Sequence, residues 1–380
     1  MKRIYMDHAA TSPLHPQALE AMMPFFSEHF GNPSSTHYYG RKAKFALEEA
    51  RRFFAGSIGA DEKEIIFTSG GTEANNLAIF GFVEKNFSRG HIITTQIEHH
   101  SVLRCFEQLE EKGFDVTYLP AGEDGIVDVE DLKQAIRDDT VFVSIMFANN
   151  ETGAIQPIAK ISSILRKRNI VFHVDAVQTY GTIRFNVHKL GIHFLSASGH
   201  KLNGPKGVGF LYAKHPLRIS PLFFGGDQER KRRAGTENVP GIVGFMEAAK
   251  IAFETLDERA AKYAQFKEEM IRIWRENGID FIVNGDLEQS LPHILNISFP
   301  GTHVASMLAN LDLAGICASS GSACTAGSAE PSHVLRAMGS SEERLQSAIR
   351  FSFGYGNTLE EVQYVAQEAA SIAKRLCHMR

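Results

Sequence analysis

One lysine stands in a setting that suits covalent chemistry. Lys201 follows an apolar run that begins at Phe194 and ends in small and polar residues, among them Ser198 and His200. Glycines and a proline then lead into a second apolar run, 208–213. The pattern predicts a strand, a tight turn and a strand. A lysine buried in such a turn loses its proton easily and becomes a nucleophile, whereas a lysine of a surface hairpin has no such role.

An acidic and an amide residue upstream favour the nucleophilic interpretation. Asp175 and Gln178 follow the apolar run 171–174, which predicts another strand. A lysine Schiff base with an aspartate facing a pyridinium nitrogen is typical of pyridoxal 5'-phosphate (PLP) enzymes. Thr68-Ser-Gly-Gly-Thr-Glu73 puts glycines at a strand-to-helix turn, where a helix N-terminus offers unpaired N–H groups to an anion. This turn is a weak signal alone, but beside Lys201 and Asp175 it predicts a phosphate site.

Three further segments could contribute to the same site. In Gln96-Ile-Glu-His-His100, His99 or His100 could stack on a flat cofactor, shuttle a proton or merely cap a helix. The amides of Asn149-Asn-Glu-Thr-Gly153 could hold a cofactor oxygen or a carboxylate, or only form a turn. Arg350 alternates with apolar residues, as does a strand arginine that receives a carboxylate in its planar fork.

Cys324 lies in a segment made only of small residues, Ser319-Ser-Gly-Ser-Ala-Cys-Thr-Ala-Gly-Ser328. Free cysteines are usually buried and behave as small hydrophobic residues. Because no neighbour in the sequence is large enough to bury this one, we expect a reactive thiol. An unshifted thiol is only a few per cent thiolate at neutral pH, so a nearby base or cation must help. A structural cysteine is the alternative.

The composition is that of a globular protein with ordinary apolar and charged content. The chain has 380 residues, of which 43% are hydrophobic and 22% charged, and its net charge of −4 argues against an overall nucleic-acid-binding field. The run Glu229-Arg-Lys-Arg-Arg233 could still form a local nucleic-acid patch, or a solvated loop or interface. No run approaches the length of a membrane span, and the N-terminus lacks the apolar stretch of a signal peptide. Four cysteines without a CxxC pair favour a cytoplasmic protein with reduced thiols.

Strand and helix patterns alternate between residues 64 and 213, which predicts a mostly parallel α/β sheet with helices on both faces. Ligands of such sheets bind beyond the carboxyl ends of the strands. Strands are predicted at 64–68, 91–96, 116–119, 141–148, 171–174, 281–284, 294–299 and 316–319. Helices are predicted at 16–30, 40–58, 129–137, 158–168, 247–277, 334–338 and 359–376, and from Glu73 and Ser101. We expect a large α/β domain at 14–256 and a small α+β domain at 257–380, joined by the N-terminal segment 1–13.

Taken together, these residues resemble the PLP-dependent cysteine desulfurases of the class V aminotransferase group. The resemblance runs from Asp7 nearly to the end of the chain, and its most specific pieces are Ser198-Gly-His-Lys201, Arg233-Ala-Gly-Thr236 and 319–324. The last piece is similar to the long-loop, housekeeping branch that is associated with iron–sulfur cluster assembly. The resemblance implies PLP fold type I and a homodimer with two active sites at the interface.

The resemblance also implies a role for each candidate residue. Lys201 would be the Schiff-base lysine, and Asp175 and Gln178 would face the ring nitrogen and the ring oxygen of PLP. His99 would stack on the ring and shuttle protons. Asn150 would contact cofactor and substrate, and would share the substrate carboxylate with Arg350. The residues expected to hold the phosphate are Gly71, Thr72, Ser198, His200 and Thr236 of the partner subunit.

The implied activity converts L-cysteine to L-alanine and leaves a persulfide on Cys324, which passes the sulfur to an acceptor protein in iron–sulfur cluster assembly or tRNA thiolation. No resident metal is implied, although Cys324 would contact an iron–sulfur cluster transiently. The family's serine after the Cys-Thr pair is replaced by Ala326, and the chain ends at Arg380 without the longer tail by which the best-known members engage a scaffold. Both departures leave the acceptor open.

Several alternatives to the desulfurase activity stay open. Another class V PLP aminotransferase or lyase would use Cys324 only structurally, and a selenocysteine lyase would take a related substrate. A PLP-free scaffold or nucleic-acid-binding protein on the same fold would use the arginines of 230–233 instead.

Overall fold

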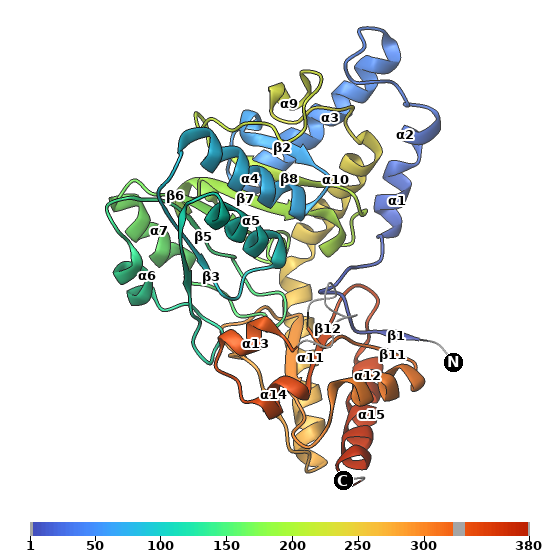
Figure 1. Cartoon of the computed structure of the whole chain (residues 1–380). Coiled ribbons are helices and arrows are strands. Elements are labelled where there is room, and N and C mark those ends of the chain that lie inside the picture. The colour runs from blue at the N-terminus through green and yellow to red at the C-terminus, as the bar shows by residue number, and fades with distance from the viewer. Residues whose placement is uncertain (1–2, 322–330, 379–380) are drawn as a thin grey trace.

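The computed structural model describes residues 3–321 and 331–378. Figure 1 shows a large sheet flanked by helices above two smaller sheets, with α11 (Leu256–Glu276) running from one part to the other. The mostly parallel α/β architecture predicted from the sequence is confirmed. Within the described ranges, none of the helices combines the length and apolar character that a membrane span requires.

The large sheet has seven strands in the order β2-β8-β7-β6-β5-β3-β4. Only β8 runs antiparallel to its two neighbours, so the other strands of this sheet share one direction and their carboxyl ends meet at one edge. The strands in chain order are β2 (Ile65–Thr68), β3 (His91–Thr95), β4 (Asp115–Leu119), β5 (Thr140–Ser144), β6 (Val171–Asp175), β7 (Phe194–Ser198) and β8 (Gly209–Ala213).

Both faces of this sheet are buried, which explains why its strands are nearly continuous apolar runs. In β5, Val143 packs in a cluster with Phe54 and Phe245, while Phe142 packs on the opposite face with Phe82. The covering helices are α3 (Tyr38–Ile58), α4 (Gly71–Asn86), α5 (His100–Glu111), α6 (Val129–Ala135), α7 (Ile158–Lys167), α8 (Val187–Leu190) and α10 (Val239–Glu254), with a short turn, η1 (Glu62–Glu64), before β2.

The smaller part has its own apolar core around Trp274, and the N-terminal residues Ile4 and Met6 pack into it. An antiparallel sheet has the order β12-β10-β9, and β1 pairs in parallel with β11. The division into domains at 256/257 stays a prediction. The elements are β1 (Ile4–Tyr5), β9 (Ile282–Val283), β10 (Ile294–Ser298), β11 (Ile316–Cys317), β12 (Ala348–Ser352), α12 (Val304–Leu313), α13 (His333–Ala337), α14 (Glu342–Gln346) and α15 (Leu359–His378).

Two helices predicted as continuous are each divided. The stretch 16–30 forms α1 (Pro16–Met22) and α2 (Pro24–Ser27), because Pro24 has no N–H and cannot continue the helical hydrogen bonding. The stretch 247–277 divides between α10 and α11 at Thr255, whose hydroxyl donates to the Ile251 carbonyl and whose ψ is 10°. The helical periodicity of each stretch was correct, but the break depends on one residue that periodicity does not detect.

Candidate active site

A cavity opens where β6 and β7 end and where α4 and α5 begin. It holds about 790 Å³, including open space at its mouth, which suits a cofactor together with a small substrate. Every predicted site residue within the described chain except Thr236 lines it, together with residues that the sequence did not indicate. The predicted residues in its wall are Gly71, Thr72, His99, Asn150, Asp175, Gln178, Ser198, His200, Lys201 and Arg350.

Lys201 reaches the cavity from η2 (Gly199–Lys201), the turn that directly follows β7. Its Nζ donates to the backbone oxygens of Ala9 at 2.6 Å and Ala10 at 2.9 Å. These carbonyls belong to the N-terminal segment, so the lysine is fixed by a part of the chain about 190 residues away. The predicted strand, turn and strand are therefore present, and the turn aims its lysine into the cavity.

Asp175 is the last residue of β6 and lies with its carboxylate in the same cavity. Its Oδ2 accepts from Asn75 Nδ2 at 2.7 Å, and its Oδ1 accepts from the Val177 N–H at 2.9 Å. Gln178 donates from Nε2 to the Ala9 carbonyl at 3.0 Å. Asp175 is thus a buried carboxyl group held by two donors, in a position that suits a partner for a pyridinium nitrogen.

The N-terminus of α4 forms a cradle that only glycines permit. Gly70 has φ 150° and ψ −173°, a conformation open essentially to glycine alone. A Cβ on Gly71 would lie 2.6 Å from a methyl of Val177, and a Cβ on Gly209 would lie 2.8 Å from the Gly70 Cα. Ser198 and the first N–H groups of a 16-residue helix converge here. These groups fit the phosphate of PLP, because helix N-termini favour anions.

His200 lies beside this cradle and carries no charge at neutral pH. Burial, with the nearby charges of Lys201 and Lys206, lowers the pKa of His200 to about 4. Its Nδ1 lies 3.1 Å from the Thr11 hydroxyl, and its carbonyl accepts from Ser12 Oγ at 2.7 Å. The N-terminal segment therefore also orients the end of the cavity beside the glycine cradle.

His99 caps a helix, as one of the roles weighed from the sequence required, and it also lines the cavity. It is the N-cap of α5, and its Nδ1 accepts from the Ser101 N–H at 3.1 Å. Burial lowers the pKa of His99 below its ordinary value, despite the opposing effect of the Asp175 charge. His100 instead lies against His333, with ring centroids 4.6 Å apart, and does not line the cavity.

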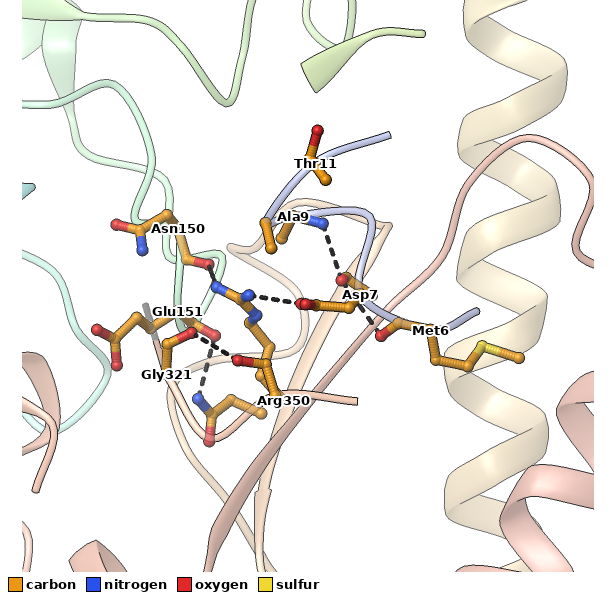
Figure 2. Close-up of polar contacts among 12 residues, drawn as sticks. Met6, Asp7, Ala9, Thr11, Asn150, Glu151, Gly321 and Arg350 are labelled. Atoms are coloured by element: carbon orange, nitrogen blue, oxygen red, sulfur yellow. Dashed lines mark hydrogen bonds and ion pairs between the residues drawn. The ribbon is translucent and has the colours of Figure 1, made fainter. Parts of the chain in front are cut away.

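Arg350 comes from β12, in the smaller part, and is 1% exposed. Figure 2 shows its guanidinium between the Asn150 carbonyl and the Asp7 carboxylate; both contacts are 2.8 Å, from Nη1 and Nη2 respectively. Its Nε is buried and has no hydrogen-bond partner. A planar fork with further donors at the cavity wall can accept a carboxylate.

A second acidic residue, Glu98, lies fully buried behind the cavity. Burial and the negative charge of Asp175 raise the pKa of Glu98 well above its usual value. Oε1 accepts from the N–H of Met146, a residue of the cavity wall, at 2.6 Å, while Oε2 has no partner. Glu98 therefore holds its proton to a higher pH than an ordinary carboxyl group does.

Two predicted site residues do not join the described cavity. Thr236 is exposed and follows Gly235, whose φ is 103°. Nearby, Arg233 donates to Glu73 of α4 at 2.9 Å and Arg232 donates to the Lys63 carbonyl at 2.8 Å. These intramolecular contacts favour a structural loop over a nucleic-acid patch. Cys324 lies outside the described residues.

The sequence did not indicate Asp7, Asn75, Glu98 or Ser101 as site residues. Asn75 was detectable in principle, because it is a polar residue on the otherwise apolar face that α4 buries. Asp7 pairs with Arg350, 343 positions away, and no local pattern signals such a partner. Among the residues that the structure describes, no group of three or more metal-ligating side chains is assembled.

Comparison with known proteins agrees with this geometry. The aminotransferase class-V family model matches residues 4–365. A Bacillus subtilis (strain 168) protein, provisionally named cysteine desulfurase IscS 1, is 55% identical over 99% of this chain and all of its own. Cysteine desulfurase IscS of Dictyoglomus turgidum is 47% identical over 99% of this chain and 96% of its own. A solved NifS-like protein superimposes with a TM-score of 0.92 at 39% identity, covering 98% of this chain and all of the other.

The family match spans almost the whole chain, and the cavity holds the lysine, the aspartate and the glycine cradle that a PLP enzyme needs. The chain therefore belongs to the aminotransferase class-V family, as a PLP-dependent cysteine desulfurase.

Proposed function

We propose that the protein converts L-cysteine to L-alanine and keeps the sulfur as a persulfide on Cys324. The observation that carries the proposal is the meeting of Lys201, Asp175 and Arg350 in one cavity, since these are the nucleophile, the ring partner and the carboxylate receptor that the reaction needs. The relatives that carry the name cysteine desulfurase support the choice of substrate.

The chain's residues divide the work by position. Arg350 and Asn150 would hold the substrate carboxylate, which leaves the Cα of cysteine near Lys201. Lys201 Nζ would accept the Cα proton, and PLP when bound supplies the electron sink that makes this proton acidic. Gln178 would face the ring oxygen, and His99 would stack on the ring. Gly71, Thr72, Ser198 and His200 would hold the phosphate.

Cys324 would perform the step that distinguishes this enzyme from an aminotransferase. Its thiolate attacks the substrate sulfur, and an S–S bond forms as the C–S bond breaks. The electron pair of the C–S bond stays with the three-carbon remainder, which takes up a proton at Cβ, regains the Cα proton and leaves as alanine. The sulfur then passes from Cys324 to an acceptor protein of iron–sulfur cluster assembly or tRNA thiolation, in the cytoplasm. The IscS names of the relatives favour iron–sulfur cluster assembly.

The same proposal includes a homodimer. Thr236 is exposed and follows a loop tied to α4 by the Arg233–Glu73 contact, so its hydroxyl has no phosphate of its own subunit to serve. Thr236 of the partner subunit would instead complete the phosphate cradle beside Ser198 and His200. The open space next to Gly71 and Lys206 leaves room for that loop.

The test is a cysteine pulse with Cys324→Ser, which keeps the size of the side chain but replaces a readily ionised sulfur by a hydroxyl. Alanine release and persulfide should fall to background, while bound PLP is retained. In the unchanged enzyme, mass spectrometry should find the added sulfur on the peptide that contains Cys324, and no keto acid should appear.

Serine at Cys105, Cys317 or Cys377 provides the matched controls. Cys105 is the strictest, because it is buried and burial raises the pKa of its thiol to about 12, far from a reactive value. Each control should keep most of the activity. Sulfur on one of these three cysteines, or normal alanine release by Cys324→Ser, would contradict the proposal.

A further inference from the structure

A chain of hydrogen bonds lies behind His99 and connects it to Asp175. Asn75 Nδ2 donates to Asp175 Oδ2 at 2.7 Å and also to Ser101 Oγ at 2.9 Å. Ser101 Oγ lies 2.8 Å from His99 Nδ1, and the Ser101 N–H donates to the same nitrogen at 3.1 Å. Three elements meet here, because Asn75 is on α4, Ser101 is on α5 and Asp175 ends β6.

Chemistry determines which group donates in the hydrogen bonds that Asn75 makes. Rotating the Asn75 amide by 180° would place its oxygen against the Asp175 carboxylate, so the NH₂ group must face Asp175 and Ser101. This orientation leaves Asn75 Oδ1 buried without a partner. Since Ser101 Oγ receives one amide hydrogen, its own hydrogen can point to His99 Nδ1. The backbone N–H of Ser101 already donates to that nitrogen, so Nδ1 is an acceptor and has no hydrogen of its own.

We propose that Ser101 and Asn75 are positioning residues, which hold His99 neutral with its hydrogen on Nε2 and couple it to Asp175. Nε2 is then the nitrogen that His99 presents to a molecule in the cavity, as a fixed hydrogen-bond donor. A proton on Nδ1 would point at the Ser101 N–H, so the network disfavours the doubly protonated ring. This inference rests on the proposed function only in assigning His99 to face the PLP ring.

Burial and the surrounding charges, taken together, also favour the neutral form of His99. Burial is the largest influence and lowers the pKa of His99, and so do the charge of Lys201 and the nearby His100 and His333. Asp175 opposes them from the end of β6. The hydrogen bonds of Ser101 and Asn75 add a local preference that burial alone cannot supply, because burial disfavours the charged ring without selecting which nitrogen carries the hydrogen.

The decisive experiment is histidine-selective ¹⁵N nuclear magnetic resonance on the cofactor-free protein, where long-range couplings report which ring nitrogen is protonated. The chain has 16 histidines, and the His99 signals are those that disappear in His99→Gln. Wild type should show the hydrogen on Nε2. Each substitution removes a hydrogen bond that favours the neutral ring, so Ser101→Ala and Asn75→Ala should each raise the pKa of His99 by about 0.7 pH unit.

Two variants control for general disturbance of the fold. Ser101→Thr keeps the hydroxyl and should keep the wild-type tautomer and titration. Ser144→Ala removes an equivalent contact, the 2.8 Å contact between a serine and His173 within the sheet, and should change the signals of His173 but not those of His99. Ser101→Ala should disturb the fold less than Asn75→Ala does, because Ser101 is only half-buried whereas Asn75 is 1% exposed.

The same variants test the consequence for the PLP-loaded enzyme. The acid limb of the pH profile for alanine formation should move to higher pH in Ser101→Ala by the amount that the His99 titration moves. A wild-type His99 with its hydrogen on Nδ1 would overturn the proposal, as would an unchanged titration in both alanine variants. Absence of alanine formation would instead contradict the proposed function and leave the resonance result standing.

Discussion

Glu98→Gln is the substitution whose effect on stability follows most directly from the structure. The side chain is fully buried, Oε1 accepts from the Met146 N–H, and Oε2 has no partner. Burial and the Asp175 charge raise the pKa of Glu98 well above the ordinary value that it has in the unfolded chain. Glutamine keeps the accepting oxygen and the volume but has no proton to release, so the comparison isolates the effect of Glu98 ionisation on stability.

The sign of the effect follows from proton binding. At a pH between the unfolded and the folded pKa of Glu98, the folded protein holds one more proton than the unfolded chain. The free energy of unfolding of wild type then falls as the pH rises, by about 1.4 kcal/mol per pH unit. Glu98→Gln lacks this slope. The variant should therefore gain stability relative to wild type as the pH rises from about 5, until the folded pKa is reached.

Urea unfolding of the cofactor-free protein measures this difference without a contribution from PLP binding. Both proteins should be followed by circular dichroism at about pH 5, 6 and 7, with equal urea dependence as the condition for comparison. Glu49→Gln, on the exposed face of α3, is the matched control and should differ from wild type by about 0.5 kcal/mol at most at every pH. If the stability of Glu98→Gln relative to wild type stays constant, or falls, as the pH rises, the raised pKa of Glu98 is refuted.

Three further substitutions test the catalytic groups. Lys201→Ala should abolish alanine formation yet leave folded protein that binds PLP non-covalently, as measured by cofactor content before and after desalting; near-normal turnover would defeat the assignment. Thr236→Val should weaken PLP retention about tenfold, because one hydrogen bond is lost, while light scattering still finds a dimer. A fully active monomer would count against the role of Thr236 in the partner's site. Arg350→Lys keeps the charge but loses the planar fork, so KM for cysteine should rise about 10- to 100-fold with a smaller change in kcat; an unchanged KM would place the carboxylate elsewhere.

The sequence was sufficient to predict the residues at the ends of the parallel strands. Asp175 and Ser198 each close an apolar run, and the carboxyl ends of parallel strands meet at one edge of a sheet. Lys201 and the glycines of α4 follow from the same reasoning, since each comes directly after a strand. These positions depend on local pattern together with one general rule of sheet topology, and neither needs knowledge of distant contacts.

The residues that sequence reasoning missed depend on contacts between distant segments. Asp7 matters because β1 pairs with β11 and so brings the N-terminal segment to Arg350. Glu98 stands beside a predicted histidine, but only the packed structure shows that its second oxygen has no partner. Ser101 resembles any residue in the first turn of a helix until the amide of Asn75 is seen to donate to it.

The N-terminal segment is the part of the chain where the two halves of the site meet. Met6 packs in the core of the smaller part, while the Ala9 carbonyl accepts from both Lys201 and Gln178 in the larger part. Between them, Asp7 holds Arg350 (Figure 2). The segment makes most of these contacts with backbone carbonyls, which every residue type offers, so its amino acids carry little sign of the role. The distance between Lys201 and Arg350 is therefore fixed by the path of this backbone as much as by either side chain.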